Sequence, residues 1–329
     1  MSDDAVLITG VAGFIGFHTA QRLLGQGRRV VGVDNFSPYY DVQLKRDRLA
    51  QLTPHPAFSF AELDIADKGM MEKLWHDQGP FREVIHLAAQ AGVRYSLVNP
   101  YEYITTNCMG HLTVLEMCRH TPDFTHLVYA SSSSVYGGNE KLPFSVQDDV
   151  SRPLSLYAAT KRSDELMSQS YSHLYSLPQT GLRFFTVYGP WGRPDMALFI
   201  FTKAIAEGRK LPVFNGGAMK RDFTYIDDIV SGVVAALASP PVQDGRQGPH
   251  RILNIGNTRS EKLMDFIRLI EKEMGRKADL EMMDMQPGDV PETFADIEET
   301  MAITGFKPVT AIAEGVPRFV TWYKQYYKV

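Results

Sequence analysis

The sequence predicts an α/β fold, with a doubly wound parallel sheet followed by a smaller, mixed α/β domain. Short apolar runs alternate with longer helical patterns through the first half, as in strand–helix–strand units. These runs are continuous rather than alternating with polar residues, which indicates strands buried on both faces. After about residue 185, Pro and Gly become frequent and helical patterns dominate. We therefore predict one domain over residues 1–185 and a second over 186–329, with segments of the second returning to the first.

The predicted elements of the first domain follow one another in a regular order. The strand Ala5–Thr9 leads through a glycine-rich turn into a helix over Phe14–Gln26. Two further long helical patterns cover Pro100–Arg119 and Ser155–Leu174. Because helices separate the strands, the sheet is expected to be parallel. The other predicted strands are Arg29–Asp34, Phe58–Leu63, Glu83–Ala88, His126–Ser131 and Gly181–Phe185.

The composition is that of an ordinary globular chain, and it excludes several classes of function. The 329 residues are 44% apolar and 22% charged, enough for a sizeable core. The net charge, 34 minus 38, is −4, which gives no electrostatic basis for binding nucleic acid or an anionic membrane. The first residues lack a signal-peptide pattern, and the longest apolar stretch, Ile229–Ala238, is too short to span a bilayer. We therefore expect a soluble protein of the cytoplasm.

The cysteines and histidines carry no disulfide or metal signal. Cys108 and Cys118 fall in one helical pattern, about 15 Å apart along a helix axis, which is too far for a disulfide. We expect two reduced thiols. No His/Cys/Asp cluster has the spacing of metal ligands, so no metal is expected. His86 is expected to be a buried structural ring, with a catalytic base as the alternative.

A glycine-rich turn after the first strand predicts a dinucleotide site. In TGVAGFIG, Gly10, Gly13 and Gly16 allow a tight turn, close approach of a pyrophosphate and close helix–strand packing. Asp34 ends the second strand 18 residues after Gly16, where a carboxylate binds an adenosine ribose and repels a 2′-phosphate. This Rossmann-type pattern predicts NAD rather than NADP. The alternative is that the glycines serve only a tight turn.

A Tyr–Lys pair and a serine run predict the reacting groups. Tyr157 and Lys161 lie four residues apart in a helical pattern, so their side chains share one face of the helix. A nearby ammonium favours a phenolate, and a phenolate can act as a base. The run Ser131–Ser134 follows a strand at the carboxyl edge of the sheet, where open α/β folds bind ligands. A hydroxyl there can bind a reacting oxygen, although a plain strand-terminal turn is the alternative.

Together these features resemble the extended short-chain dehydrogenase/reductase family along essentially the whole chain. The motifs that carry the resemblance are TGVAGFIG, Asp34, SSSSVYG and Tyr157-x-x-x-Lys161. The family implies a tightly bound NAD that is regenerated in each cycle, with catalysis by Tyr157, Lys161 and Ser132. It also implies that the cofactor contacts Gly10, Gly13, Phe14, Ile15, Gly16, Asp34, Asn35, Asp64, Ile65, Leu87, Ala88, Ala89, Asn107, Ser131, Tyr157 and Lys161.

Two further segments narrow the resemblance. Residues 34–45 (DNFSPYYDVQLK) and 182–197 (LRFFTVYGPWGRPDMA) are similar to the nucleotide-sugar 4-epimerases that act on UDP-glucuronate. Family members for neutral hexoses typically carry Asn where Thr186 stands, and the threonine hydroxyl could instead meet a sugar carboxylate. For Arg94, the alternative to binding the ligand is that it is a solvated cation on a loop. The resemblance implies a UDP-sugar bound by Arg94, Ser132, Ser133, Ser134, Tyr157, Thr186, Arg193, Val213, Phe214, Arg221 and Asp289.

The implied reaction interconverts UDP-glucuronate and UDP-galacturonate through transient oxidation at C4. The 4-keto sugar can lose its carboxylate, so hydroxyls are expected to hold the carboxylate away from the alignment that favours this loss. Related hexose dehydratases carry Asp-Glu in place of Ser133-Ser134, and UDP-glucuronate decarboxylases carry Glu in place of Ser134. Three alternatives stay open: a UDP-glucose/UDP-galactose 4-epimerase, a UDP-glucuronate decarboxylase, and a non-catalytic dinucleotide-sensing interaction protein.

The resemblance also implies a homodimer. Enzymes of the family commonly associate through two helices from each chain, which pack as a four-helix interface. The corresponding helical patterns here are 99–119 and 155–174. We therefore expect a homodimer.

Overall fold

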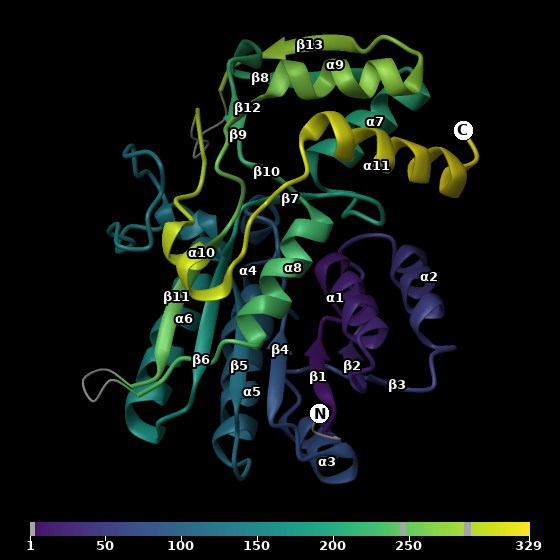
Figure 1. The fold of residues 1–329 in the computed structure, drawn as a ribbon. Helices are drawn as coiled ribbons and strands as arrows, with labels where there is room; N and C mark the ends of the chain where they lie inside the picture. The colour runs from purple at the N-terminus through teal and green to yellow at the C-terminus, as the bar shows by residue number, and fades with distance from the viewer. Residues whose placement is uncertain (1–3, 244–247, 286–290) are drawn as a thin grey trace.

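A seven-stranded parallel sheet forms the centre of the molecule (Figure 1). The computed structural model describes residues 4–243, 248–285 and 291–329. The strand order β11-β6-β5-β4-β1-β2-β3 reverses direction between β1 and β4, where an open α/β sheet binds its ligand. This confirms the predicted doubly wound fold. The strands are β1 (Val6–Thr9), β2 (Val30–Asp34), β3 (Phe58–Glu62), β4 (Glu83–His86), β5 (His126–Ser132), β6 (Gln179–Phe184) and β11 (His250–Ile255).

Helices cover both faces of this sheet, as the continuous apolar strands predict (Figure 1). Val6 and Ile8 belong to one apolar core and Leu7 to the other, because successive side chains of a strand point to opposite faces. All three are fully buried. The first face is covered by α1 (Phe14–Gly25) and α8 (Ile226–Leu237), with α2 (Val42–Leu52) beside α1; the second is covered by α3 (Lys68–Gln78), α5 (Gly110–Arg119) and α6 (Leu156–Tyr175).

The helix predicted over residues 100–119 is not one continuous α-helix, which corrects that expectation. Between α4 (Pro100–Tyr103) and α5 lies a π-helical segment, η2 (Ile104–Met109). Such a bulge inserts an extra residue into a turn and often occurs at functional sites. Here it carries Asn107, whose side chain accepts from the Gln90 amide at 2.8 Å and donates to the Gln90 carbonyl at 3.1 Å. The irregular turn thus anchors the loop that follows β4.

The seventh strand lies beyond residue 185 and is absent from the predicted set. β11 pairs with β6 from His250 opposite Gln179 to Ile255 opposite Phe184. Its sequence, HRILNI, mixes polar and apolar residues after a Pro- and Gly-rich stretch, so periodicity does not mark it as a buried strand. Together with α8, this strand makes the second half of the chain part of the central sheet layer.

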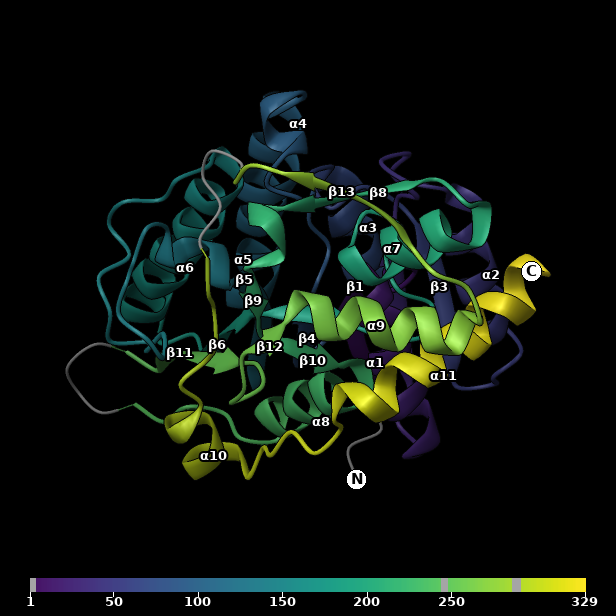
Figure 2. The same ribbon diagram turned by 90° about the horizontal axis from the view of Figure 1, so that it is seen from above.

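Much of the second half forms a layer over the carboxyl ends of the strands (Figure 2). Its apolar side chains, including Phe223, Phe266 and Phe319, join the same core as Ile8 and Phe14. The upper layer is therefore packed onto the sheet through one continuous core. Its helices are α7 (Ala197–Glu207), α9 (Leu263–Met274) and α11 (Ile312–Tyr327), while α10 (Glu298–Thr304) lies beside β11. Its short strands pair as β7 (Thr186–Tyr188) with β10 (Phe223–Tyr225), β8 (Lys210–Phe214) with β13 (Asp279–Met283), and β9 (Lys220–Arg221) with β12 (Glu261–Lys262).

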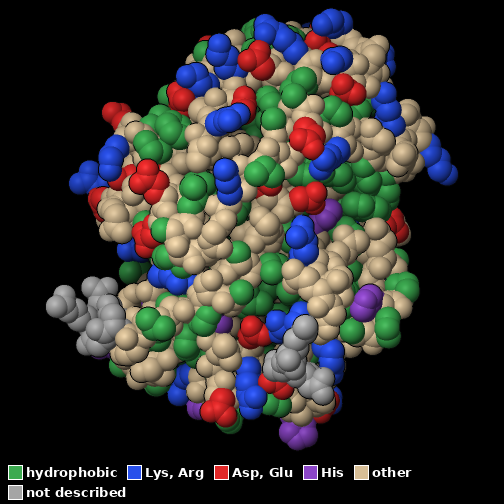
Figure 3. Space-filling view, in the orientation of Figure 1, with side chains coloured by type: hydrophobic (Ala, Val, Ile, Leu, Met, Phe, Trp, Pro, Cys, Tyr) green, Lys and Arg blue, Asp and Glu red, His purple; other side chains and the backbone are tan. Residues whose placement is uncertain are grey.

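Charged side chains of both signs are interspersed on the face shown in Figure 3. Within residues 4–243, 248–285 and 291–329, every helix is too short or too polar to cross a membrane. Both cysteines are free thiols, with Cys118 buried and Cys108 partly so.

Candidate active site

The turn between β1 and α1 is a cradle that only glycine can form. Gly10 has φ +72°, and a Cβ there would stand 2.7 Å from the Ala88 nitrogen. A Cβ on Gly16 would stand 2.1 Å from the Gly10 carbonyl oxygen, so this residue brings α1 tightly against the turn. Gly13 precedes α1, and no side chain caps the first turn of the helix. The first amide groups of α1, beginning at Phe14 and Ile15, are thus left for an anion.

Asp34 lies at the carboxyl end of β2, beside this turn. Its Oδ2 accepts from the Ala12 amide at 3.1 Å and its Oδ1 from the Phe36 amide at 2.9 Å. Burial raises the pKa of this carboxyl, whereas Lys45 and the two amides act to lower it. The next side chain, Asn35, donates to Asp64 Oδ2 at 2.9 Å, so the ends of β2 and β3 are joined. The fixed carboxyl has the position that a ribose-binding acid needs.

The end of β4 supplies the other wall of the turn. The Ala88 amide donates to Thr9 Oγ1 at 3.2 Å, which ties the end of β4 to β1. Asn107 also donates to Thr160 Oγ1 at 3.0 Å, and it thereby connects this wall to α6. The sequence-predicted cofactor residues at this wall are Leu87, Ala88, Ala89 and Asn107, and Ile65 packs nearby against Gly110.

These features fit NAD. The cradle leaves no room for side chains, the helix amides face a position for the pyrophosphate, and Asp34 accepts hydrogen bonds but repels an added phosphate. Residues from the ends of β1, β2 and β4 therefore converge on the point where the strand order reverses.

Tyr157 and Lys161 stand in the first turns of α6, which begins after its N-cap, Ser155. The Tyr157 ring lies edge-on to Tyr103, with 6.0 Å between ring centroids. Lys161 is 3% exposed and donates to the Ala130 carbonyl at 3.0 Å and to an acidic side chain, Asp164, at 3.1 Å. Asp164 is not among the residues predicted from the sequence, because nothing in its local pattern marks it as buried.

The serine run divides into a buried and a partly exposed part. Ser131 is buried and donates to Glu165 Oε1 at 2.6 Å. Ser132 begins the 3₁₀ turn η3 (Ser133–Tyr136), and its Oγ accepts from the Ser134 amide at 3.2 Å and from the Ser134 hydroxyl at 2.9 Å. Ser132, Ser133 and Ser134 are partly exposed. The turn expected as the alternative is thus formed, and these three side chains stay accessible beyond β5.

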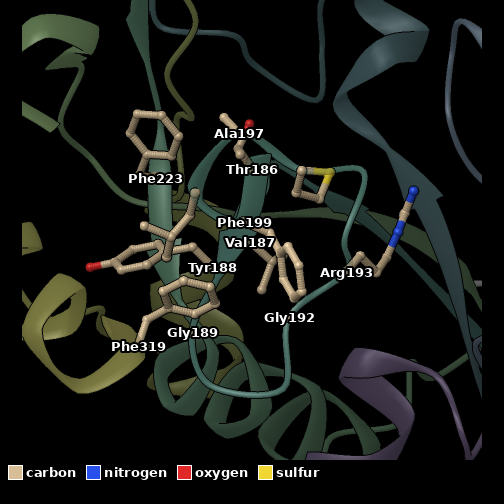
Figure 4. Close-up of a pocket in the computed structure, with 12 residues that line it drawn as sticks. Thr186, Val187, Tyr188, Gly189, Gly192, Arg193, Ala197, Phe199, Phe223 and Phe319 are labelled. Atoms are coloured by element: carbon tan, nitrogen blue, oxygen red, sulfur yellow. The ribbon is translucent and has the colours of Figure 1, made fainter. Parts of the chain in front are cut away.

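Thr186 and Arg193 line a small cavity under β7 (Figure 4). The Arg193 side chain points away from the aromatic rings of that cavity in the close-up. It meets Asp195 through two hydrogen bonds, Nε to Oδ1 at 3.1 Å and Nη2 to Oδ2 at 2.5 Å. Tyr39, from the segment between β2 and α2, donates to the same Oδ2 at 2.9 Å. Burial raises the pKa of Asp195, but Arg193 outweighs it, so the net pKa lies below its usual value.

Of the remaining predicted substrate residues that the structure describes, Arg94 lies in the loop after β4 and the others lie in the upper layer. Arg94 is exposed, and its guanidinium lies 5.1 Å from the Phe214 ring centroid. Val213 is fully buried, whereas Phe214 is partly exposed. Arg221 donates to the Lys220 carbonyl at 2.9 Å and to the Pro291 carbonyl at 3.2 Å. Asp289 lies outside the described residues.

His86, the last residue of β4, has a buried imidazole ring. It is 3% exposed and shares a 2.7 Å hydrogen bond with Thr9 Oγ1. Burial lowers its pKa to about 3, with a smaller contribution from Lys161, so the ring is neutral near pH 7. This is the structural role expected for His86.

A glycine cradle, a carboxyl at the end of β2 and a Tyr–Lys pair on α6 define an NAD-binding α/β enzyme of the Rossmann type. The chain belongs to the NAD dependent epimerase/dehydratase family, whose model matches residues 6–256. The family predicted from the sequence and the predicted cofactor, NAD, are thereby confirmed.

Named relatives extend over nearly the whole chain. The probable UDP-glucuronate 4-epimerase of Rhizobium meliloti is 48% identical and aligns with 98% of this chain and 97% of its own length. UDP-glucuronate 4-epimerase 2 of Arabidopsis thaliana is 46% identical, over 98% of this chain and 76% of its own. The structure is similar to that of UDP-glucuronic acid 4-epimerase from Bacillus cereus in complex with UDP-glucuronic acid and NAD. That chain has a TM-score of 0.88 and 34% identity, and the match covers 98% of this chain and 100% of that one.

Proposed function

We propose that this chain is a UDP-glucuronate 4-epimerase, an NAD-dependent isomerase that interconverts UDP-glucuronate and UDP-galacturonate. The observation that carries the proposal is the arrangement of Tyr157, Lys161 and the partly exposed serines at the carboxyl edge of the sheet. Relatives named as a UDP-glucuronate 4-epimerase or a probable one match 98% of this chain, and this similarity supports the proposal.

Tyr157 acts as the base of the reaction and Lys161 as its electrostatic partner. Tyr157 takes the proton of the sugar 4-hydroxyl and later returns it, while the ammonium of Lys161 stabilises the phenolate. Bound NAD supplies reversible oxidation and reduction at C4. Ser132 binds the same sugar oxygen and keeps it in reach of Tyr157. The held geometry of Lys161, with the Ala130 carbonyl as acceptor, supports this assignment.

The sugar carboxylate is held by hydroxyl groups. Ser133, Ser134 and Thr186 provide neutral donors, and Arg193 adds a charge that Asp195 partly balances. A ketone at C4 lies β to this carboxylate, so carbon dioxide is lost most easily when the breaking bond is parallel to the carbonyl π system. Donors that fix the carboxylate away from this alignment favour epimerisation over decarboxylation.

We assign the cofactor to the first half of the chain and the nucleotide end of the UDP-sugar mainly to the second half. The cofactor residues named from the sequence occupy the first half, which we place at residues 1–185. Phe214 stacks against the uracil beside Val213, with Arg94, Arg221 and Asp289 near the diphosphate and ribose. The contact of Arg94 with Phe214 supports a shared role at the nucleotide end.

We infer that the enzyme is a homodimer of the cytoplasm. Large apolar side chains are exposed on η2 and α6: Ile104 is 50% exposed, Met109 52%, Leu166 52% and Leu174 65%. Exposed apolar residues that cluster on adjacent helices are typical of an interface. Replacement of Leu166 by Glu, which places a charge on this face, should halve the mass measured by light scattering if the dimer forms here.

One experiment tests the reaction directly. Purified protein is incubated with UDP-glucuronate without added cofactor, and the products are followed by proton NMR. UDP-galacturonate without any pentose supports the proposal and shows that NAD is carried. A UDP-pentose instead identifies a decarboxylase, and turnover of UDP-glucose alone identifies a neutral-sugar epimerase. Absence of any reaction, even with NAD added, supports the non-catalytic alternative.

A further inference from the structure

An acidic side chain lies directly behind Lys161. Asp164 is three residues further along α6, and its Oδ2 is 3.1 Å from the Lys161 Nζ. The two side chains are 1% and 3% exposed, so water screens their interaction little. Lys161 also donates to the Ala130 carbonyl, which fixes the ammonium near the end of β5. The role proposed for Lys161 does not by itself require a carboxyl group at this position.

The neighbours of Asp164 carry few other charges near neutral pH. Burial raises the pKa values of Cys108 and Tyr129 and lowers that of His111, so these three groups are neutral. Arg183 outweighs burial and keeps the pKa of Glu165 below its usual value, so Glu165 stays charged in a closed ion pair. The titratable groups that face Asp164 are Lys161 and Glu165 from α6, Cys108 from η2, His111 from α5 and Tyr129 from β5.

One oxygen of Asp164 has no partner. Within the described part of the chain, its buried Oδ1 makes no hydrogen bond, while Oδ2 meets Lys161. A buried carboxylate oxygen without a donor disfavours the charged form. Burial raises the pKa of Asp164 to about 7, although Lys161 acts in the opposite direction. The charge of this carboxyl is therefore expected to change near neutral pH.

We propose that Asp164 is a positioning residue for Lys161, whose carboxylate balances the lysine charge and thereby sets the pH at which Tyr157 loses its proton. The inference rests on the proposed function in that Tyr157 and Lys161 are the base and its electrostatic partner. The three residues stand at positions i, i+4 and i+7 of α6, so they share one helix face. A negative charge behind the ammonium lowers the positive potential at the phenol. The carboxylate therefore disfavours the phenolate, and protonation of Asp164 favours it.

The variant Asp164→Asn separates charge from geometry. It keeps the size of the side chain and an oxygen that can accept from Nζ, but it has no charge. We expect the acidic limb of the pH profile of kcat with UDP-glucuronate to move about one unit toward lower pH. Asp148→Asn is the matched control, because it removes a carboxylate that pairs with Lys141 in the 139–148 loop. That control should leave the limb in place.

A second readout does not depend on turnover. The ultraviolet difference spectrum between each protein and its Tyr157→Phe counterpart reports the phenolate of Tyr157 alone. Its midpoint should fall by about one unit in Asp164→Asn, as in the rate profile. If this shift is seen while no UDP-sugar is turned over, the proposed function fails but the inference stands. If turnover is normal and neither midpoint moves, the inference is overturned.

A purely structural role for Asp164 predicts a different result. In that case Asp164→Asn would lower the melting temperature and leave both midpoints unchanged, which also overturns the inference. Asp164→Ser serves if the asparagine variant does not fold, because a smaller hydroxyl leaves room for water beside Nζ. It should show the same downward shift, since it too lacks the negative charge.

Discussion

The cofactor side and the substrate side of the proposed active site are held in different ways. On the cofactor side, the critical atoms belong to backbone or to side chains fixed by buried contacts, such as Gly10 against Ala88 and Lys161 on Ala130. On the substrate side, partly exposed side chains from segments far apart in the sequence hold each other, as Arg94 does with Phe214 and Tyr39 with Asp195. The first half is preorganised by close packing. The second depends on contacts that a ligand can exchange for its own.

This difference indicates where a substitution should have the largest effect. Changes on the cofactor side should act in an all-or-none manner, because no nearby group can replace the one removed. Changes on the substrate side should be graded and should act mainly on substrate binding. Substitutions on the two sides can therefore test this contrast.

The largest loss is expected at Tyr157. Tyr157→Phe removes only the hydroxyl, and turnover of UDP-glucuronate should fall by about 10³-fold or more because the proposed base of the reaction is lost. NMR assays of product and circular dichroism of the fold provide the measurement. Activity close to that of the wild type would contradict the assignment of the base.

The next largest effect is expected at the glycine cradle. Gly10→Ala places a Cβ against the Ala88 backbone at positive φ, so we expect loss of bound NAD and about 1–3 kcal/mol of stability. Gly275→Ala is the matched control, with φ +69° but open space around its Cβ. It should lose about 1 kcal/mol through backbone strain and keep NAD. Thermal unfolding and the absorbance of released nucleotide measure both quantities. Equal NAD content in the two variants would contradict the prediction.

A smaller effect is expected where the two halves meet. Asp195→Asn weakens the ion pair that orients Arg193, and we expect KM for UDP-glucuronate to rise about tenfold while NAD content is unchanged. Tyr39→Phe removes only the hydrogen bond to the same oxygen and should raise KM less. Steady-state kinetics measure KM for UDP-glucuronate in both variants. A loss of NAD in either variant would show that the two halves are not separable in this way.

The smallest effect is expected at Arg94. Its exposed guanidinium contacts Phe214, and a surface cation–π contact contributes about 0.5–1 kcal/mol. Arg94→Ala should therefore raise KM for UDP-glucuronate by about five-fold or less, with kcat unchanged. A large fall in kcat would instead place Arg94 beside the reacting carbon.

The same contrast explains which elements and site residues can be predicted from the sequence. The six predicted strands and the Gly10 turn are visible because local periodicity and small residues at fixed spacing determine them. The pair Tyr39 and Asp195 is separated by 156 residues, and no local pattern records such a contact. The burial of Asp164 cannot be predicted from the sequence for another reason. A charged residue on a helix is ordinarily solvated, and only the packing of α5 and η2 against α6 shows that it is buried.

The π-helical turn and the last strand of the sheet escape prediction for topological reasons. The irregularity at η2 follows from the hydrogen bonds of Asn107 to Gln90 and Thr160, which belong to other parts of the chain. β11 joins the sheet by pairing with the edge strand β6. Neither partner is a neighbour in sequence.

Strand β11 also bears on how the chain folds during synthesis. Until residue 255 has left the ribosome, β6 presents an unpaired edge, although every residue of the glycine turn and of the Tyr–Lys helix has already been made. An exposed edge of this kind pairs readily with other chains. We therefore expect an interval during synthesis in which the central sheet of the nascent protein is vulnerable to misassembly. That interval ends only when β11, from the second half of the chain, has been made.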